Sequence, residues 1–151
     1  MQAHDVEYKI QGDDMQMVSV VLDPQESVIA EAGAMMLMTA GINMDAIAGD
    51  GSNDNAGVME KLMGAGKRML TGSSAFMSIF TNTGTSRGYV SFAAPFPGKI
   101  LAIDLKEYNN HLICQKSSFL CAAKGVATIQ PVSTLRVSPA ANSFLITIPP
   151  A

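Results

Sequence analysis

The chain has 151 residues, a formal net charge of −3, and 48% hydrophobic residues against only 15% charged residues. This length is enough for one domain with a proper core, and the apolar composition excludes an intrinsically disordered protein. No apolar run reaches the roughly 18 to 20 uninterrupted residues of a membrane-spanning helix, so we expect a domain that does not cross a bilayer. The first residues, MQAHD, lack the basic and apolar regions of a signal peptide, which favours a cytoplasmic location.

The first part of the chain alternates apolar and polar side chains with the period of two that is typical of half-buried strands. The pattern predicts strands at 6–10 and 15–22, with a Gly-Asp turn between them. Pro24 ends the second strand, because proline has no amide donor for a strand ladder. Two further strands are expected at 27–32 and 34–39, separated by a glycine.

The next part of the chain loses this alternation. Residues 41–57 are rich in glycine, asparagine and aspartate, which predicts a loop. Apolar residues then recur at helical spacing from Val58 to Met69. We therefore expect one short amphipathic helix near residues 56–68, weakened by two internal glycines.

Strand signals return in the second half of the chain at nearly even spacing. The expected strands are 75–81, 88–93, 99–105, 112–115, 118–122 and 126–130. Many short strands at even spacing are typical of an antiparallel sandwich or barrel. The sequence therefore predicts an all-β fold of antiparallel layered sheets.

The charges are distributed unevenly along the chain. Eleven carboxylates and one lysine fall in residues 1–60, whereas nine basic residues and two carboxylates fall in residues 61–151. Three interpretations are open: pairing of the halves within one domain, head-to-tail association of subunits, or nucleic acid on the basic half. Internal pairing is preferred, and nucleic acid is disfavoured because few basic residues cluster. The candidate interface or binding residues are Lys61, Lys67 and Arg68.

No catalytic or cofactor-binding pattern emerges from the sequence. The two histidines, His4 and His111, are too few for a histidine-based metal site, and His111 is expected in a turn. Residues 64–68 (GAGKR) lack the spacing and the Ser or Thr of a phosphate-binding loop, and residues 71–74 (TGSS) lack the second glycine of a nucleophile elbow. We therefore expect no enzyme, no cofactor and no metal.

Methionine and cysteine are the soft residues whose placement bears on function. All eleven methionines fall between Met1 and Met77. Pairs of methionine thioethers can bind Cu(I), but methionine also packs in cores and interfaces. Their neighbours are valine, leucine and isoleucine, which favours a core or an interface over copper. Cys114 and Cys121 fall on neighbouring predicted strands, and we expect two buried free thiols rather than a disulfide.

Four segments together resemble a known family. They are residues 22–36 (LDPQESVIAEAGAMM), 67–74 (KRMLTGSS), 93–100 (AAPFPGKI), and 112–116 with 119–122 (LICQK and FLCA). In this order they resemble the altered inheritance of mitochondria protein 24 family over roughly residues 6–125. The resemblance implies antiparallel β layers similar to the trp RNA-binding attenuation protein (TRAP), assembly into oligomers and a link to mitochondrial biogenesis. It implies no catalytic residues.

The end of the chain departs from the family, whose members usually continue through further strands. We therefore divide the chain into a TRAP-like β domain at 1–130 and an atypical tail at 131–151, interpreted as truncated or frame-shifted. Missing strands would expose sheet edges that pair with another chain. We expect self-association into a ring or trimer-like homo-oligomer.

The function expected from these observations is that of a non-enzymatic assembly or binding protein. The alternative is a ligand or nucleic-acid binder that uses the basic second half. The basic residues beside the amphipathic helix also suit peripheral membrane contact.

Overall fold

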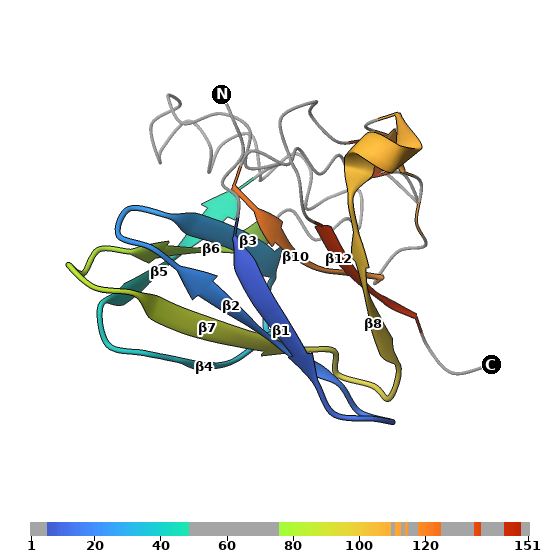
Figure 1. The fold of residues 1–151 in the computed structure, drawn as a ribbon, viewed down its shortest axis with the longest axis horizontal. Coiled ribbons are helices and arrows are strands. Elements are labelled where there is room, and N and C mark those ends of the chain that lie inside the picture. The colour runs from blue at the N-terminus through green and yellow to red at the C-terminus, as the bar shows by residue number, and fades with distance from the viewer. Residues whose placement is uncertain are drawn as a thin grey trace.

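In the computed structural model, two antiparallel sheets pack face to face (Figure 1). The structure describes residues 6–48, 76–109, 111–112, 114, 118–124, 135–136 and 144–148. The four-stranded sheet has the order β1-β2-β7-β4, the six-stranded sheet has the order β5-β6-β3-β10-β12-β8, and a small sheet pairs β11 with β9. The elements are β1 (Glu7–Gln11), β2 (Met17–Leu22), β3 (Ser27–Glu31), β4 (Met35–Met38), β5 (Ile42–Ala48), β6 (Phe76–Asn82), β7 (Gly88–Ala93), β8 (Lys99–Ile103), the 3-10 helix η1 (Leu105–Tyr108), β9 (His111–Leu112), β10 (Phe119–Ala123), β11 (Leu135–Arg136) and β12 (Phe144–Ile148).

The four-stranded sheet follows directly from the alternating pattern of the sequence. In β2, Val18, Val20 and Leu22 are fully buried, and the residues between them are half-buried on the outer face. β2 pairs with β7 along its whole length without a register shift. On the outer face the hydroxyls of Ser19 and Ser91 share a hydrogen bond of 2.8 Å. The strand predicted here is therefore confirmed.

The chain passes from the six-stranded sheet to the four-stranded sheet between β3 and β4. Gly33 lies in this turn with φ of 87°, a left-handed conformation that favours glycine. The Ala34 amide closes the turn by donating to the Glu31 carbonyl at 3.1 Å. The predicted break between two strands at this glycine is confirmed.

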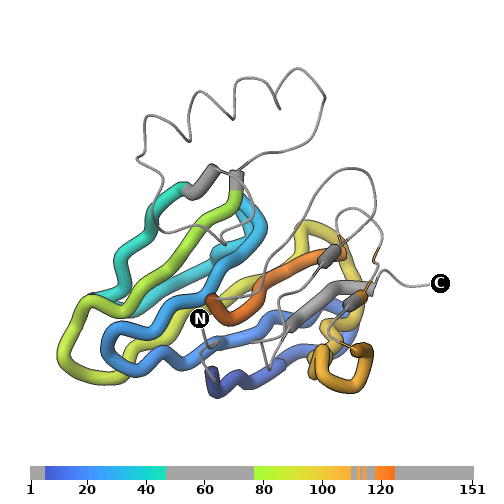
Figure 2. The backbone as a smooth tube through the Cα atoms, turned by 90° about the horizontal axis from the view of Figure 1, so that it is seen from above, coloured from blue at the N-terminus to red at the C-terminus, as the bar shows by residue number. Residues whose placement is uncertain are grey.

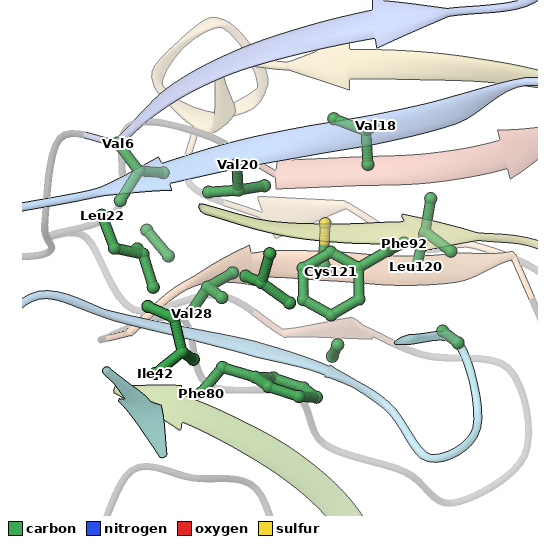
Figure 3. Close-up of a cluster of buried hydrophobic side chains, with 14 of the residues drawn as sticks. Val6, Val18, Val20, Leu22, Val28, Ile42, Phe80, Phe92, Leu120 and Cys121 are labelled. Atoms are coloured by element: carbon green, nitrogen blue, oxygen red, sulfur yellow. The ribbon is translucent and has the colours of Figure 1, made fainter. Parts of the chain in front are cut away.

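The main core lies between the two sheets (Figure 3). Phe80 of β6 and Phe92 of β7 meet edge to face, with 5.2 Å between the ring centroids and 70° between the ring planes. Viewed from above, β2 and β10 run in separate layers (Figure 2). A second, smaller apolar cluster covers the opposite side of the six-stranded sheet and contains Ile29, Met77, Leu105, Phe119 and Ala122.

The structure confirms the all-β fold of antiparallel layers and corrects one expected loop. Residues 42–48, the first part of the loop expected at 41–57, form β5, which pairs with β6 along its full length. The reason is tertiary, because β6 offers a ladder of backbone donors and acceptors that a weakly patterned segment can join. The helix expected near 56–68 and the strand expected at 126–130 lie outside the described residues.

The strand expected at 99–105 ends early, and η1 follows it. The Asp104 carboxylate caps η1 by accepting from the Lys106 amide at 3.0 Å. His111, expected in a turn, instead lies in β9, where it pairs with Arg136 of β11. In the described part of the chain, no helix is long and apolar enough to cross a membrane.

β12 brings the end of the chain into the six-stranded sheet. It pairs antiparallel with β10 on one side and with β8 on the other. These five residues belong to the segment 131–151 that the sequence sets apart as an atypical tail. β12 therefore joins β8 to the rest of the sheet.

Candidate functional site

A pocket of about 360 Å³ opens beside the turn between β3 and β4. This volume lies at the lower end of the range that is typical of small-molecule sites. Three separate parts of the chain line the pocket: the β3–β4 turn, the segment that follows β7, and the start of β10. The lining residues are Glu31, Ala32, Gly33, Ala34, Ala94, Pro95, Phe96, Phe119 and Leu120.

Backbone hydrogen bonds hold two sides of the pocket together. The Ala93 amide at the end of β7 donates to the Ala34 carbonyl at 3.0 Å, which ties the β3–β4 turn to the four-stranded sheet. At the far end of the segment after β7, the Gly98 amide donates to the Asp14 carbonyl at 3.0 Å. The segment that carries Pro95 and Phe96 is therefore fixed at both of its ends.

Two of the lining residues belong to the two apolar cores. Leu120 is 2% exposed and joins the cluster between the sheets, whereas Phe119 joins the cluster on the other side of the six-stranded sheet. The two residues face opposite ways at a register shift in the pairing of β10 with β12. Because both side chains are packed into a core, this part of the lining is held in place by the fold.

Among the described residues that line the pocket, Glu31 is the one ionisable side chain. The other described lining residues are alanine, glycine, proline, phenylalanine and leucine. Among the described residues, no three histidine, cysteine, aspartate or glutamate side chains gather closely enough to hold a metal ion. The described lining residues therefore offer mainly apolar surface and one carboxylate.

The two cysteines are free thiols, as expected, but they differ in burial. Cys121 is fully buried in the main core, and burial raises its pKa far above that of an ordinary thiol. Cys114 is only half-buried, and burial raises its pKa as well. A nucleophilic cysteine requires a lowered thiol pKa, and neither of these environments lowers it.

The uneven charge of the sequence is partly neutralised within the domain. Arg87 contacts Asp23 at 2.6 Å and Glu7 at 3.2 Å, and Lys99 contacts Asp13 at 2.6 Å. Each pair joins a carboxylate of the first half to a base of the second half. These contacts support the interpretation that the two halves pair inside one domain.

The candidate residues Lys61, Lys67 and Arg68 lie outside the described part of the chain. The pocket was not anticipated from the sequence, because its lining residues are common apolar types spread over three distant segments. The available signal was that residues 31–34, 93–96 and 119–120 all fall within segments that resemble one family. The folded structure brings these three segments together at one site.

Comparison with known proteins settles the family. The sequence matches the family described as Mitochondrial biogenesis AIM24 over residues 8–145. The chain belongs to the AIM24 family. The resemblance inferred from the four segments is thus confirmed, and the match extends past residue 125 into β12.

The AIM24 chain also shares its fold with a solved structure. The crystal structure of protein SPYM3_0169 from Streptococcus pyogenes superposes with a TM-score of 0.64 at 20% sequence identity. The alignment covers 94% of this chain and 64% of that protein, so the AIM24 chain spans less than two thirds of its length. At this identity the likeness shows the fold alone. A search of curated proteins gives no match.

Proposed function

We propose that this AIM24-family domain is a non-enzymatic binding and assembly module, which holds an apolar group in the pocket beside the β3–β4 turn. The observation that carries the proposal is the convergence of three family segments on one preformed apolar site. Backbone hydrogen bonds on two sides of the pocket, and two lining residues that pack into the cores, hold the site in place. Little conformational entropy of the protein is therefore lost when a ligand binds. The link to mitochondrial biogenesis comes from the family.

The lining determines the class of ligand. Phe96, Phe119 and Leu120 favour an alkyl chain or an aromatic ring, since burial of apolar surface drives its binding. We therefore propose a neutral apolar ligand, with the apolar part in the pocket.

The neutral dye Nile red tests this proposal. The purified chain is titrated with the dye, and fluorescence is compared for wild type, Ala94→Phe and Ala46→Phe. Ala94 lines the pocket, whereas Ala46 is exposed on β5, outside the pocket lining. We expect saturable binding to wild type and to Ala46→Phe, and an affinity about tenfold lower for Ala94→Phe because the added ring occupies the pocket. Equal binding to all three proteins would refute the pocket as the site.

The proposal also includes self-association into a homo-oligomer. It is supported by apolar side chains that remain exposed on β4 and β7, among them Met36 at 59% and Tyr89 at 45%. Light scattering after size-exclusion chromatography, together with native mass spectrometry, measures the subunit number. A stable monomer at all concentrations would refute this part.

Nucleic acid on the basic second half is the weaker alternative. Two of the basic residues there, Arg87 and Lys99, already contact carboxylates of the same chain. A titration with short single-stranded RNA at two salt concentrations compares the two proposals. Tight binding that weakens steeply with salt would favour the alternative.

A further inference from the structure

β4 has the composition of an interior strand but lies at an edge of the four-stranded sheet (Figure 1). Its sequence, MMLM, is apolar throughout, without the polar alternation of a strand that faces water on one side. β10 shows where such a strand belongs, since all of its residues are buried and strands flank it on both sides. Among the strands that the structure describes, β4 pairs with β7 alone.

The register of β4 on β7 places apolar side chains on both faces of this edge. Met35 and Met38 pair with Phe92 and Val90, two residues buried between the sheets, so they lie on the core side. Leu37 pairs with Ser91 and lies on the outer side. Much of this surface remains uncovered, because Met36, Leu37 and Met38 are 59%, 43% and 41% exposed.

The other edges of the two large sheets carry charged residues, which β4 lacks. β1 and β5 bear charged residues, which disfavour pairing with another strand. In β8, the Ile100 amide on the free side donates to the Gln16 side chain at 2.6 Å, and the neighbouring Lys99 contacts Asp13. β4 has no charged residue and no proline, and its one irregularity among these pairings is a register shift against β7 between Met35 and Leu37. Of the four edges described, β4 is therefore the one suited to pairing with another strand.

We propose that β4 pairs antiparallel with β4 of a second copy of this chain, so that two four-stranded sheets form one continuous eight-stranded sheet. The free edge of β4 pairs across the irregularity that lies between Met35 and Leu37. A twofold axis between Met36 and Leu37 sets Met35 opposite Met38 of the partner and Met36 opposite Leu37 of the partner. This arrangement buries apolar side chains on both faces and brings no like charges together. Methionine side chains are flexible enough to fill the gap that each edge leaves. The inference rests on the self-association proposed above and is independent of the pocket.

The size of the surface limits the expected affinity. A standard interface buries about 800 Å² on each partner, which is more than a four-residue edge supplies. Tyr89, half-exposed on β7 beside the end of β4, extends the apolar surface on the outer side. We therefore expect a dimer that dissociates on dilution, with a Kd of about 1 μM or weaker.

Two matched substitutions test the interface in the full chain. Met36→Lys places two ammonium groups close to the twofold axis, whereas Met15→Lys makes the same change at a methionine that is 66% exposed in the β1–β2 turn. Sedimentation velocity over a range of concentrations gives the dimer Kd, and urea unfolding checks that each variant is folded. We expect Met36→Lys to weaken dimerisation by about tenfold or more and Met15→Lys to leave it unchanged.

A cysteine mixture tests the register directly. Chains carrying Met35→Cys are mixed with chains carrying Met38→Cys under mild oxidation, and each variant alone is the control. The proposed register brings these positions opposite each other, so a disulfide dimer should form in the mixture far faster than in either control. Equal rates would overturn the register.

The outcomes separate this inference from the proposed function. A monomer at every concentration overturns both the β4 interface and self-association. An oligomer that Met36→Lys leaves intact overturns the β4 interface alone. The Nile red experiment bears only on the pocket.

Discussion

Asn82, at the end of β6, is a buried polar residue whose side chain holds two turns together. It is 1% exposed. Its amide nitrogen donates to the carbonyls of Leu22 and Ser86 at 2.8 and 2.9 Å, and its amide oxygen accepts from the Gly84 amide at 3.0 Å. The side chain therefore links the end of β2 to the turn between β6 and β7. We predict that Asn82→Ala destabilises the domain strongly.

The magnitude follows from where the three partners lie. Leu22 is fully buried, so water cannot replace the donor that its carbonyl loses, and such a loss costs about 1–3 kcal/mol. Gly84 and Ser86 lie in a turn that is open to solvent, so their two hydrogen bonds together contribute about 1 kcal/mol. The free energy of unfolding should therefore fall by about 2–4 kcal/mol.

Urea unfolding followed by far-ultraviolet circular dichroism measures this change. Asn43→Ala is the matched control, because Asn43 is exposed and its side chain makes one hydrogen bond, to Asp45. The control should change the free energy of unfolding by less than about 0.5 kcal/mol. If the free energy of unfolding of Asn82→Ala lies within about 0.5 kcal/mol of that of the control, the hydrogen bond to the Leu22 carbonyl does not stabilise the domain and the prediction is wrong.

Asn82→Asp provides a test of the same contact by pH. An ionised carboxylate still accepts from Gly84 but cannot donate to Leu22, and burial beside a carbonyl raises its pKa in the folded state. Stability should then fall relative to wild type as the pH rises above the pKa of an unfolded aspartate, about 3.9. A deficit that is independent of pH would contradict this account.

Two further predictions concern titrating groups. Burial raises the pKa of Cys121, so above about pH 8.5 the unfolded chain binds fewer protons than the folded one and stability falls as pH rises. Urea unfolding between about pH 8 and pH 10 should show a weaker decline in Cys121→Ala, and a thiol reagent should modify native Cys114 but not native Cys121. Lys99 lowers the pKa of Asp13, chiefly through the hydrogen bond between their side chains. The stability from this pair is present above the unfolded pKa of aspartate and is lost as the pH falls through the folded value. NMR titration should find the pKa of Asp13 closer to its ordinary value in Lys99→Met, and an unchanged pKa would count against the contact.

Much of the local structure was predictable because its causes act within a few residues. The alternation through β2 determined both the strand and its buried face, since successive side chains of a strand point to opposite sides. Pro24 and Gly33 predicted the breaks on either side of β3, because one removes a ladder donor and the other supplies a left-handed conformation.

Other elements depended on partners far away in the sequence. β5 has little alternation of its own and became a strand because β6 pairs with it, from Ala48 with Phe76 to Ile42 with Asn82. β4 was predicted as a strand, but its sequence did not indicate that it would lie at a sheet edge with both faces apolar. That position depends on β7 being its neighbour.

The sequence by itself determined the all-β class, the turns and the four segments that identify the family. Only the tertiary structure decided that Glu31, Phe96 and Leu120 line one pocket. It also decided that Arg87 contacts Asp23, a residue far from it in the sequence. The physical reason is that the alternation of apolar and polar side chains and the residue types of turns are local properties of the chain. Strand order and register depend instead on pairing and core packing between residues that are distant in sequence.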